Sequence, residues 1–226
     1  MTGSNQIKST WSWQQKLKRA VVVFREEGIK SFWFKLLSEI GCYRRLLLLE
    51  RSLEEPIPEI KPHFPVTIDL LKKTELDEYV LFSFKNYFIP DNHDVSRIIH
   101  SLSAGDLCFV ARHERELISF SWVTTHPTRA SYSYMASEIP LMPGEIYVYD
   151  PFTRTDFRGL AVSPAIRAEM IRYFRSIGYR RMILGTLPEN NLNLRAVRKV
   201  GFQPFGLIGY IKIGTWRWNF YRTNKL

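Results

Sequence analysis

A run of small residues ahead of a predicted helix is the part of the sequence best suited to binding a ligand. The run Arg158-Gly159-Leu160-Ala161-Val162-Ser163 follows a predicted strand, Glu145–Thr153, and leads into a helix that is predicted to begin at Pro164. Small side chains let a ligand approach the backbone closely, and the free amide groups at a helix N-terminus favour a phosphate. The run therefore indicates an anion site, although the same pattern also serves plain packing of a strand against a helix.

A second group of residues, further along the chain, makes the pattern more specific. Asn190 and Asn193 precede and begin a predicted helix that ends in Lys199-Val200-Gly201-Phe202. Together with the earlier run, these residues resemble the GNAT superfamily of acyl-CoA-dependent N-acetyltransferases. Members of that superfamily carry an R-G-x-G-x-G/A turn, and later an N-x-x-S/A helix ending in K-x-G-F. The resemblance extends over residues 66–226.

The resemblance implies that acetyl-CoA or another acyl-CoA is the co-substrate. In such enzymes the backbone amides of the turn hold the pyrophosphate, the end of the preceding strand pairs with the pantetheine arm as an added strand, and the next strand–helix junction contacts the cofactor. The residues that match the turn are Arg158, Gly159, Leu160, Ala161, Val162 and Ser163. Those that match the strand end and the junction are Phe152, Thr153, Asn190 and Asn193.

The implied reaction is direct transfer of an acetyl or other short acyl group to an amine in a ternary complex. The amine must lose a proton, and Glu145 lies where the histone-type branch of the superfamily carries a base glutamate. The alternative for Glu145 is a solvated residue that begins a strand. Tyr149, on the same strand face by parity, and Tyr210, in a late hairpin, are candidates to donate or orient a proton. For each tyrosine taken singly, packing is the favoured interpretation.

Departures from the family pattern keep a second class of function open. Val197 stands where many relatives carry a tyrosine that protonates the departing thiolate, and Ala161 stands where glycine is usual. Ser163, also unusual, either caps the helix or adds a hydroxyl donor. The alternative is therefore a non-catalytic acyl-CoA-binding or scaffold protein on the same fold.

The distribution of charge bears on the partner. The net charge is +10, and residues 158–226 contain 13 Lys or Arg and 2 Asp or Glu. This basic part coincides with the segment that resembles a coenzyme A site, whose ligand carries several phosphate charges. A basic nucleic-acid-binding module is the third and least favoured interpretation.

The elements that must position these residues predict an α/β (α+β) fold, with a mixed and mostly antiparallel central sheet flanked by helices. Four prolines within residues 56–65 exclude a continuous helix or central strand there. We therefore expect an N-terminal helical extension over 1–53, a linker over 54–65 and the GNAT-like domain over 66–226. Residues 43–51, rich in leucine, are predicted to form a strand before the linker.

The N-terminal segment and the cysteines bear on location. Aromatic and basic residues mix over 11–40, which predicts either a peripheral membrane contact or packing on a protein surface. The polar start of the chain predicts no signal peptide. The two cysteines, distant in sequence and without histidines at ligand spacing, predict no metal site. We expect a cytoplasmic protein, with a peripheral membrane position as the alternative.

Overall fold

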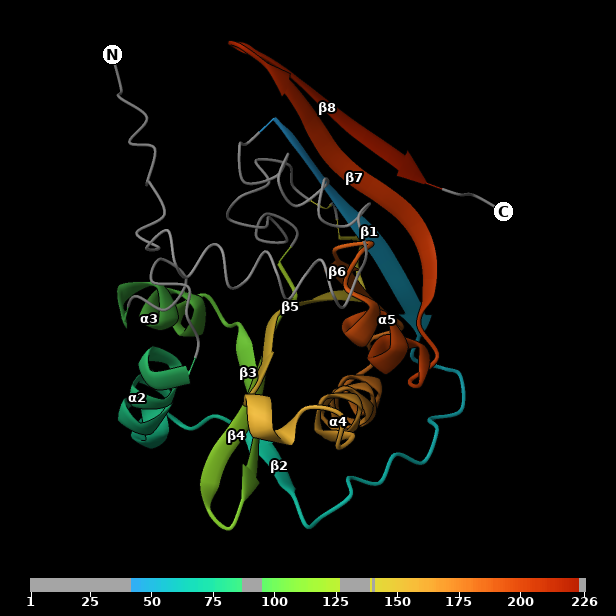
Figure 1. Ribbon diagram of the computed structural model, residues 1–226. Coiled ribbons are helices and arrows are strands. Elements are labelled where there is room, and N and C mark those ends of the chain that lie inside the picture. The colour runs from blue at the N-terminus through green and yellow to red at the C-terminus, as the bar shows by residue number, and fades with distance from the viewer. Residues whose placement is uncertain (1–41, 87–94, 127–138, 140, 224–226) are drawn as a thin grey trace.

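The computed structural model describes residues 42–86, 95–126, 139 and 141–223 (Figure 1). The helices predicted within residues 1–41 lie outside this part of the chain, as does the membrane or protein contact expected there. Within the described residues, no helix is long and apolar enough to cross a membrane.

Eight strands form one mixed sheet in the order β2-β3-β4-β5-β6-β1-β7-β8. Neighbouring strands are antiparallel except for β5 and β6, which are parallel. The expected fold class, a mixed and mostly antiparallel sheet with helices on it, is confirmed. The strands are β1 (Tyr43–Ser52), β2 (Thr67–Leu70), β3 (Leu107–His113), β4 (Glu116–Thr124), β5 (Glu145–Thr153), β6 (Arg181–Thr186), β7 (Gln203–Ile213) and β8 (Trp216–Thr223).

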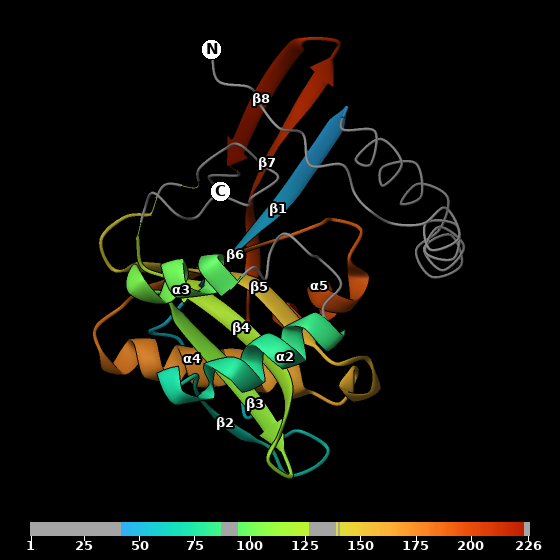
Figure 2. The same cartoon turned by 90° about the vertical axis from the view of Figure 1, so that its left-hand side faces the viewer.

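Helices cover both faces of the sheet. On one face, α2 (Leu76–Asn86) and α3 (Val95–Ser103) pack through Tyr79, Phe82 and Ile98 onto β3 and β4 (Figure 2). On the other face lie α4 (Val162–Ser176) and α5 (Asn191–Arg198), which contribute most of the helical residues of the largest apolar cluster. The two faces of the sheet are thus separate environments, divided by the strands themselves.

Strand β1 differs from its expected role in an N-terminal extension. It lies inside the sheet, antiparallel to both β6 and β7. Leu46 and Leu48 pack into one apolar cluster and Leu49 into another, so the continuous apolar run is that of a strand buried on both faces. The sheet therefore begins before the proline-rich segment, and the boundary expected at residue 66 is too late.

The proline-rich segment is bound to the domain that it was expected to precede. The guanidinium of Arg51 donates to the carbonyl oxygens of Val200 and of Pro56, the latter at 2.7 Å. Arg175 of α4 donates to the carbonyl oxygens of Leu53 and Glu55. These hydrogen bonds hold the segment against the end of α4, where the chain passes from β1 in the middle of the sheet to β2 at its edge.

Candidate functional site

Strands β5 and β6 pair at their beginnings and then separate. Their register runs from Glu145 opposite Arg181 to Val148 opposite Leu184, whereas β5 continues to Thr153 and β6 to Thr186. A bulge in β5 accompanies the separation.

In the bulge, Asp150 and Pro151 together face the single residue Ser121 of β4. The flanking pairs are Tyr149 with Trp122 and Phe152 with Phe120. Asp150 has a φ of 44°, in the left-handed region, and Pro151 has no amide hydrogen to give to a neighbour. Pro151 therefore stands where the strand bends away from β6.

Beyond the bulge, one edge of β5 has no strand beside it among the described residues. The carbonyl of Phe152 accepts from Ser119 Oγ at 2.6 Å, and the amide of Arg154 donates to the Ile118 carbonyl at 2.9 Å, so both groups point toward β4. The Thr153 carbonyl between them points the other way and accepts from Arg158 Nε at 3.1 Å. Phe152 and Thr153, expected to border a pantetheine arm, thus lie on the strand whose outer edge is open.

The turn that follows β5 has the backbone of a glycine-rich loop, although it contains one glycine. Gly159 has a φ of 81°, and Ala161, where glycine is usual in the family pattern, has a φ of 63°. A left-handed conformation costs a residue with a Cβ atom about 1–2 kcal/mol. Helix α4 begins directly after Ala161, and its first turn contains no acidic residue. Its free amide groups and the helix dipole favour an anion there.

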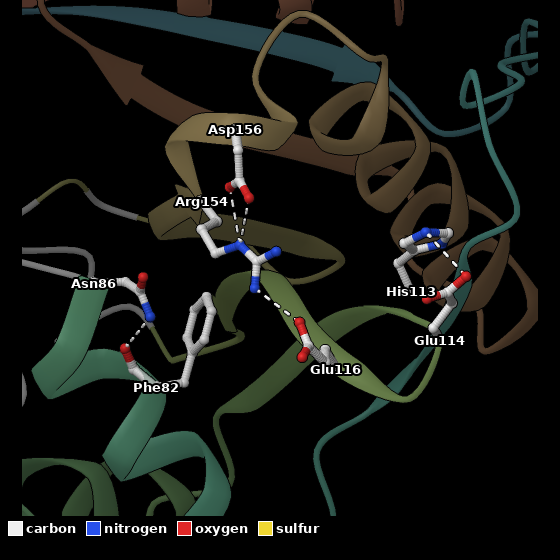
Figure 3. A network of polar contacts seen from close by, with 7 residues as sticks. All are labelled: Phe82, Asn86, His113, Glu114, Glu116, Arg154 and Asp156. Atoms are coloured by element: carbon white, nitrogen blue, oxygen red, sulfur yellow. Dashed lines mark hydrogen bonds and ion pairs between the residues drawn. The ribbon is translucent and has the colours of Figure 1, made fainter.

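Two arginines near this turn are in different electrostatic situations. Arg154 forms ion pairs with Glu116 at 3.1 Å and Asp156 at 2.9 Å, as Figure 3 shows. Arg158 lies 5.9 Å from the Phe152 ring centre, and among the described residues no carboxylate is within ion-pair distance of it. Arg158 is therefore the cation of the turn whose charge remains for an anionic ligand.

A buried arginine connects the turn to α5. Arg167 of α4 donates to Ser163 Oγ and, at 2.8 Å, to Asn193 Oδ1. Asn193 Nδ2 donates to Thr186 Oγ1 at 3.0 Å, and the Asn193 amide donates to Asn190 Oδ1 at 3.1 Å. Asn190 is thus the N-cap of α5, and Asn193 ties α5 to the end of β6. The hydroxyl of Ser163, which accepts from Arg167, keeps its own hydrogen to donate.

On the opposite face of the sheet, Tyr149 projects from the point where β5 leaves β6. Its hydroxyl donates to Asp106 Oδ2 at 2.8 Å and lies 3.4 Å from Ser101 Oγ. Burial, followed by the nearby Asp106 carboxylate, raises the pKa of Tyr149 well above its usual value, so the phenol stays protonated at neutral pH. Asp106 is a functional candidate that the sequence did not reveal, because it belongs to no motif.

Tyr210 lies on the same face as Tyr149, on the far side of the separation. It packs with Tyr147 and Ile208 in one apolar cluster, against which Tyr149 also rests. The Arg217 guanidinium lies 4.0 Å from the Tyr210 ring centre, an arrangement that favours the cation. The structure thus brings together two of the three expected catalytic residues on one face.

Glu145 lies apart from the two tyrosines. It begins β5, four residues before Tyr149, which is ~13 Å along a strand. Its carboxylate is buried, accepts from the Met142 amide at 2.9 Å and pairs with Arg181, which also pairs with Glu50. The alternative of a solvated Glu145 is therefore wrong, since this carboxylate belongs to a partly buried ion-pair cluster.

Val197 and Cys108 are core residues. Val197 is fully buried in the largest apolar cluster beneath α5, at the place of the expected family tyrosine. Cys108 is buried in β3, and this burial raises the pKa of its thiol well above the usual value. Among the residues that the structure describes, no group of three or more His, Cys, Asp or Glu could hold a metal ion.

Solved structures of GNAT acetyltransferases share this arrangement of strands and helices. One from Novosphingobium aromaticivorans is 15% identical with a TM-score of 0.51, and the match covers 74% of this chain and 65% of that one, just under two thirds of its length. One from Colwellia psychrerythraea is 12% identical with a TM-score of 0.55, covering 79% of this chain and 57% of that one.

A third similar structure is the glucosamine N-acetyltransferase region of a fungal multi-domain β-N-acetylglucosaminidase. It is 16% identical with a TM-score of 0.51, and the match covers 85% of this chain and 22% of that one. No family model and no curated protein matches the sequence. The chain has the GNAT fold, as the two sequence motifs predict.

Proposed function

We propose that the protein is an acyl-CoA-dependent N-acyltransferase that moves an acetyl or other short acyl group directly to an amine. The observation that carries this proposal is the opening between β5 and β6. On one side it has a cationic turn at a helix N-terminus, and on the other a proton-bearing tyrosine beside a buried carboxylate. The GNAT fold agrees with this arrangement.

The co-substrate would lie along the open edge of β5 and end at the turn. Arg158 would meet its phosphates as a cation, Ser163 would add a hydroxyl donor, and the amides at the start of α4 would complete the anion site. Phe152 and Thr153 would border its pantetheine arm. Asn190 and Asn193 would act mainly by fixing α5 beside the turn, because their side chains are already hydrogen-bonded. When bound, acyl-CoA supplies the activated acyl group.

Two carboxylates compete for the role of base. Asp106 accepts a hydrogen bond from Tyr149, so a proton leaving the amine could reach it through the phenol oxygen, while the phenol proton passes to Asp106. Glu145 is engaged by Arg181 and by the Met142 amide at the start of β5, away from the point where β5 leaves β6. We therefore assign the base to Asp106 acting through Tyr149, with Glu145 second. Tyr210 is the candidate donor to the departing thiolate.

A free-thiol assay with acetyl-CoA and a panel of amines tests the reaction. The panel includes glucosamine, because one similar structure is a glucosamine N-acetyltransferase region, together with a polyamine, free lysine and a peptide amine. We expect Asp106→Asn and Tyr149→Phe to lower kcat by about 100-fold, the usual scale for a general base, and Glu145→Gln to change it much less. The reverse order would assign the base to Glu145.

Binding of coenzyme A is measured separately by calorimetry. Arg158→Gln should weaken binding by about tenfold, with less dependence on salt, because one charge facing the phosphates is lost. Arg172→Gln is the matched control, since this exposed arginine of α4 already pairs with Glu169 at 2.7 Å. Equal effects of the two variants would place the anion site elsewhere.

The alternative function is a non-catalytic acyl-CoA-binding protein. The burial of Val197 favours it, because the position of the family tyrosine provides no proton donor. Binding of coenzyme A without turnover on any amine would support this alternative, whereas turnover on one amine, abolished in Tyr149→Phe, would reject it.

A further inference from the structure

The two outer strands, β7 and β8, form a hairpin that extends beyond the helices (Figures 1 and 2). Its outer part, residues 211–221, is called the distal hairpin. Among the strands that the structure describes, β8 pairs with β7 alone and is the edge of the sheet. Its residues are exposed except for Phe220, which is half-buried against Tyr43. Tyr210, the proposed donor to the thiolate, lies at the base of this arm, and none of the residues of the distal hairpin is assigned to coenzyme A.

Large apolar side chains gather on one face of the distal hairpin. Ile213 is 75% exposed, Trp216 84% and Trp218 65%. Ile213 lies directly opposite Trp216, and Ile211 opposite Trp218, so the four side chains share one face of the ribbon. Two tryptophans and an isoleucine this exposed at the end of an arm indicate that a membrane or another molecule covers this surface.

The other face of the distal hairpin is basic. Lys212 and Arg217 lie opposite each other, and strand alternation turns them away from the two tryptophans. Residues 203–223 contain three basic residues, Lys212, Arg217 and Arg222, and no Asp or Glu. The hairpin is therefore an amphipathic ribbon whose charge is entirely positive, which is complementary to an anionic surface.

We propose that the distal hairpin docks on an anionic lipid bilayer. Tryptophan favours the boundary between headgroups and acyl chains, and Ile213 would enter the apolar layer. Lys212 and Arg217, whose side chains have long apolar stems, would reach back to lipid phosphates.

Other occupants fit the hairpin less well. A second copy of the chain would bring two positive surfaces together. A single-stranded nucleic acid would stack on the tryptophans, but Ile213, the tip residue, offers no ring for stacking.

Cosedimentation of the full-length protein with vesicles tests the proposal. We expect binding to vesicles of phosphatidylcholine and phosphatidylglycerol, and weaker binding to phosphatidylcholine alone. The variant I213S/W216S/W218S should lower the partition constant by at least about tenfold. Lys212→Gln with Arg217→Gln should remove the preference for the anionic vesicles. The matched control is L81S/F84S, because these two exposed apolar residues lie on α2, outside the distal hairpin.

Three outcomes would overturn the proposal. These are no vesicle binding by the unaltered protein, unchanged binding by the triple variant, and an equal loss in the α2 control. Hairpin-dependent dimerisation in light scattering, or binding of a single-stranded oligonucleotide without vesicle binding, would also reject it and assign the face to that partner. Because the triple variant could misfold, the single variant Trp216→Ser is also measured, and its circular-dichroism melting curve shows whether it is folded. A folded single variant must still bind vesicles more weakly.

Discussion

Gly201 is the residue whose replacement should reveal most clearly how the fold is held together. It is the glycine of the K-x-G-F pattern after α5 and has a φ of 86°. A Cβ atom there would lie 1.8 Å from Nη1 of Arg51, far inside any real contact. Arg51 is 3% exposed and donates to the carbonyl oxygens of Val200 and Pro56. Gly201→Ala therefore forces a buried guanidinium away from both partners.

The expected destabilisation has two parts. The left-handed backbone costs alanine about 1–2 kcal/mol. Displacing a buried cation from two carbonyl oxygens costs about 3 kcal/mol more, since hydrogen bonds of charged groups contribute roughly 1.5–3 kcal/mol each. Gly178→Ala is the matched control, because Gly178 has a φ of 88° and nothing within 4 Å of its added Cβ. It should show the backbone part alone.

Urea unfolding measures both variants, with the m-value as a check that the transition stays two-state. We expect the free energy of unfolding to fall by about 3 kcal/mol more in Gly201→Ala than in Gly178→Ala. In an Arg51→Ala background, Gly201→Ala should cost no more than the control, because the clash is gone. A difference of less than about 1 kcal/mol between the two glycine variants, or a difference that persists in the Arg51→Ala background, would show that Arg51 does not set the cost at Gly201.

Three further predictions follow from strain, titration and hydrogen bonding. Ala161→Gly should raise the free energy of unfolding by about 0.5–1 kcal/mol, because it relieves a left-handed alanine, and a decrease in urea unfolding would contradict this. Tyr149 keeps its phenol proton in the folded state above pH ~10, where the unfolded chain loses it, so stability falls as the pH rises through that range. Tyr149→Phe should make this alkaline decline shallower, and an unchanged slope would refute the role of Tyr149. Asn193→Ala should lower the melting temperature and weaken coenzyme A binding in calorimetry, because it removes the hydrogen bonds that join α5 to Arg167 and Thr186. Unchanged binding would show that Asn193 contributes to stability alone.

Local patterns in the sequence predicted the elements that surround the site. Strands β5 and β6, the helix after the turn and the helix after Asn190 each follow from residues adjacent in the chain, whose spacing and backbone preferences act over a few positions. The two motifs also predicted the GNAT fold, because the turn and the α5 helix lie in fixed order on either side of β6.

Contacts between residues distant in the chain decided which side chains of the site meet. The hydrogen bond of Tyr149 with Asp106 and that of Arg167 with Asn193 join residues far apart in the chain. The sequence around each residue does not distinguish a buried, paired aspartate or arginine from an exposed one. The ion pair of Glu145 likewise depends on the neighbouring strand.

The placement of β1 is the clearest case. Its short run of leucines, bounded by charged residues, determined by itself only that a strand forms there. That this strand lies in the middle of the sheet, between β6 and β7 and covered on both faces, was decided by hydrogen bonding and packing across the tertiary structure.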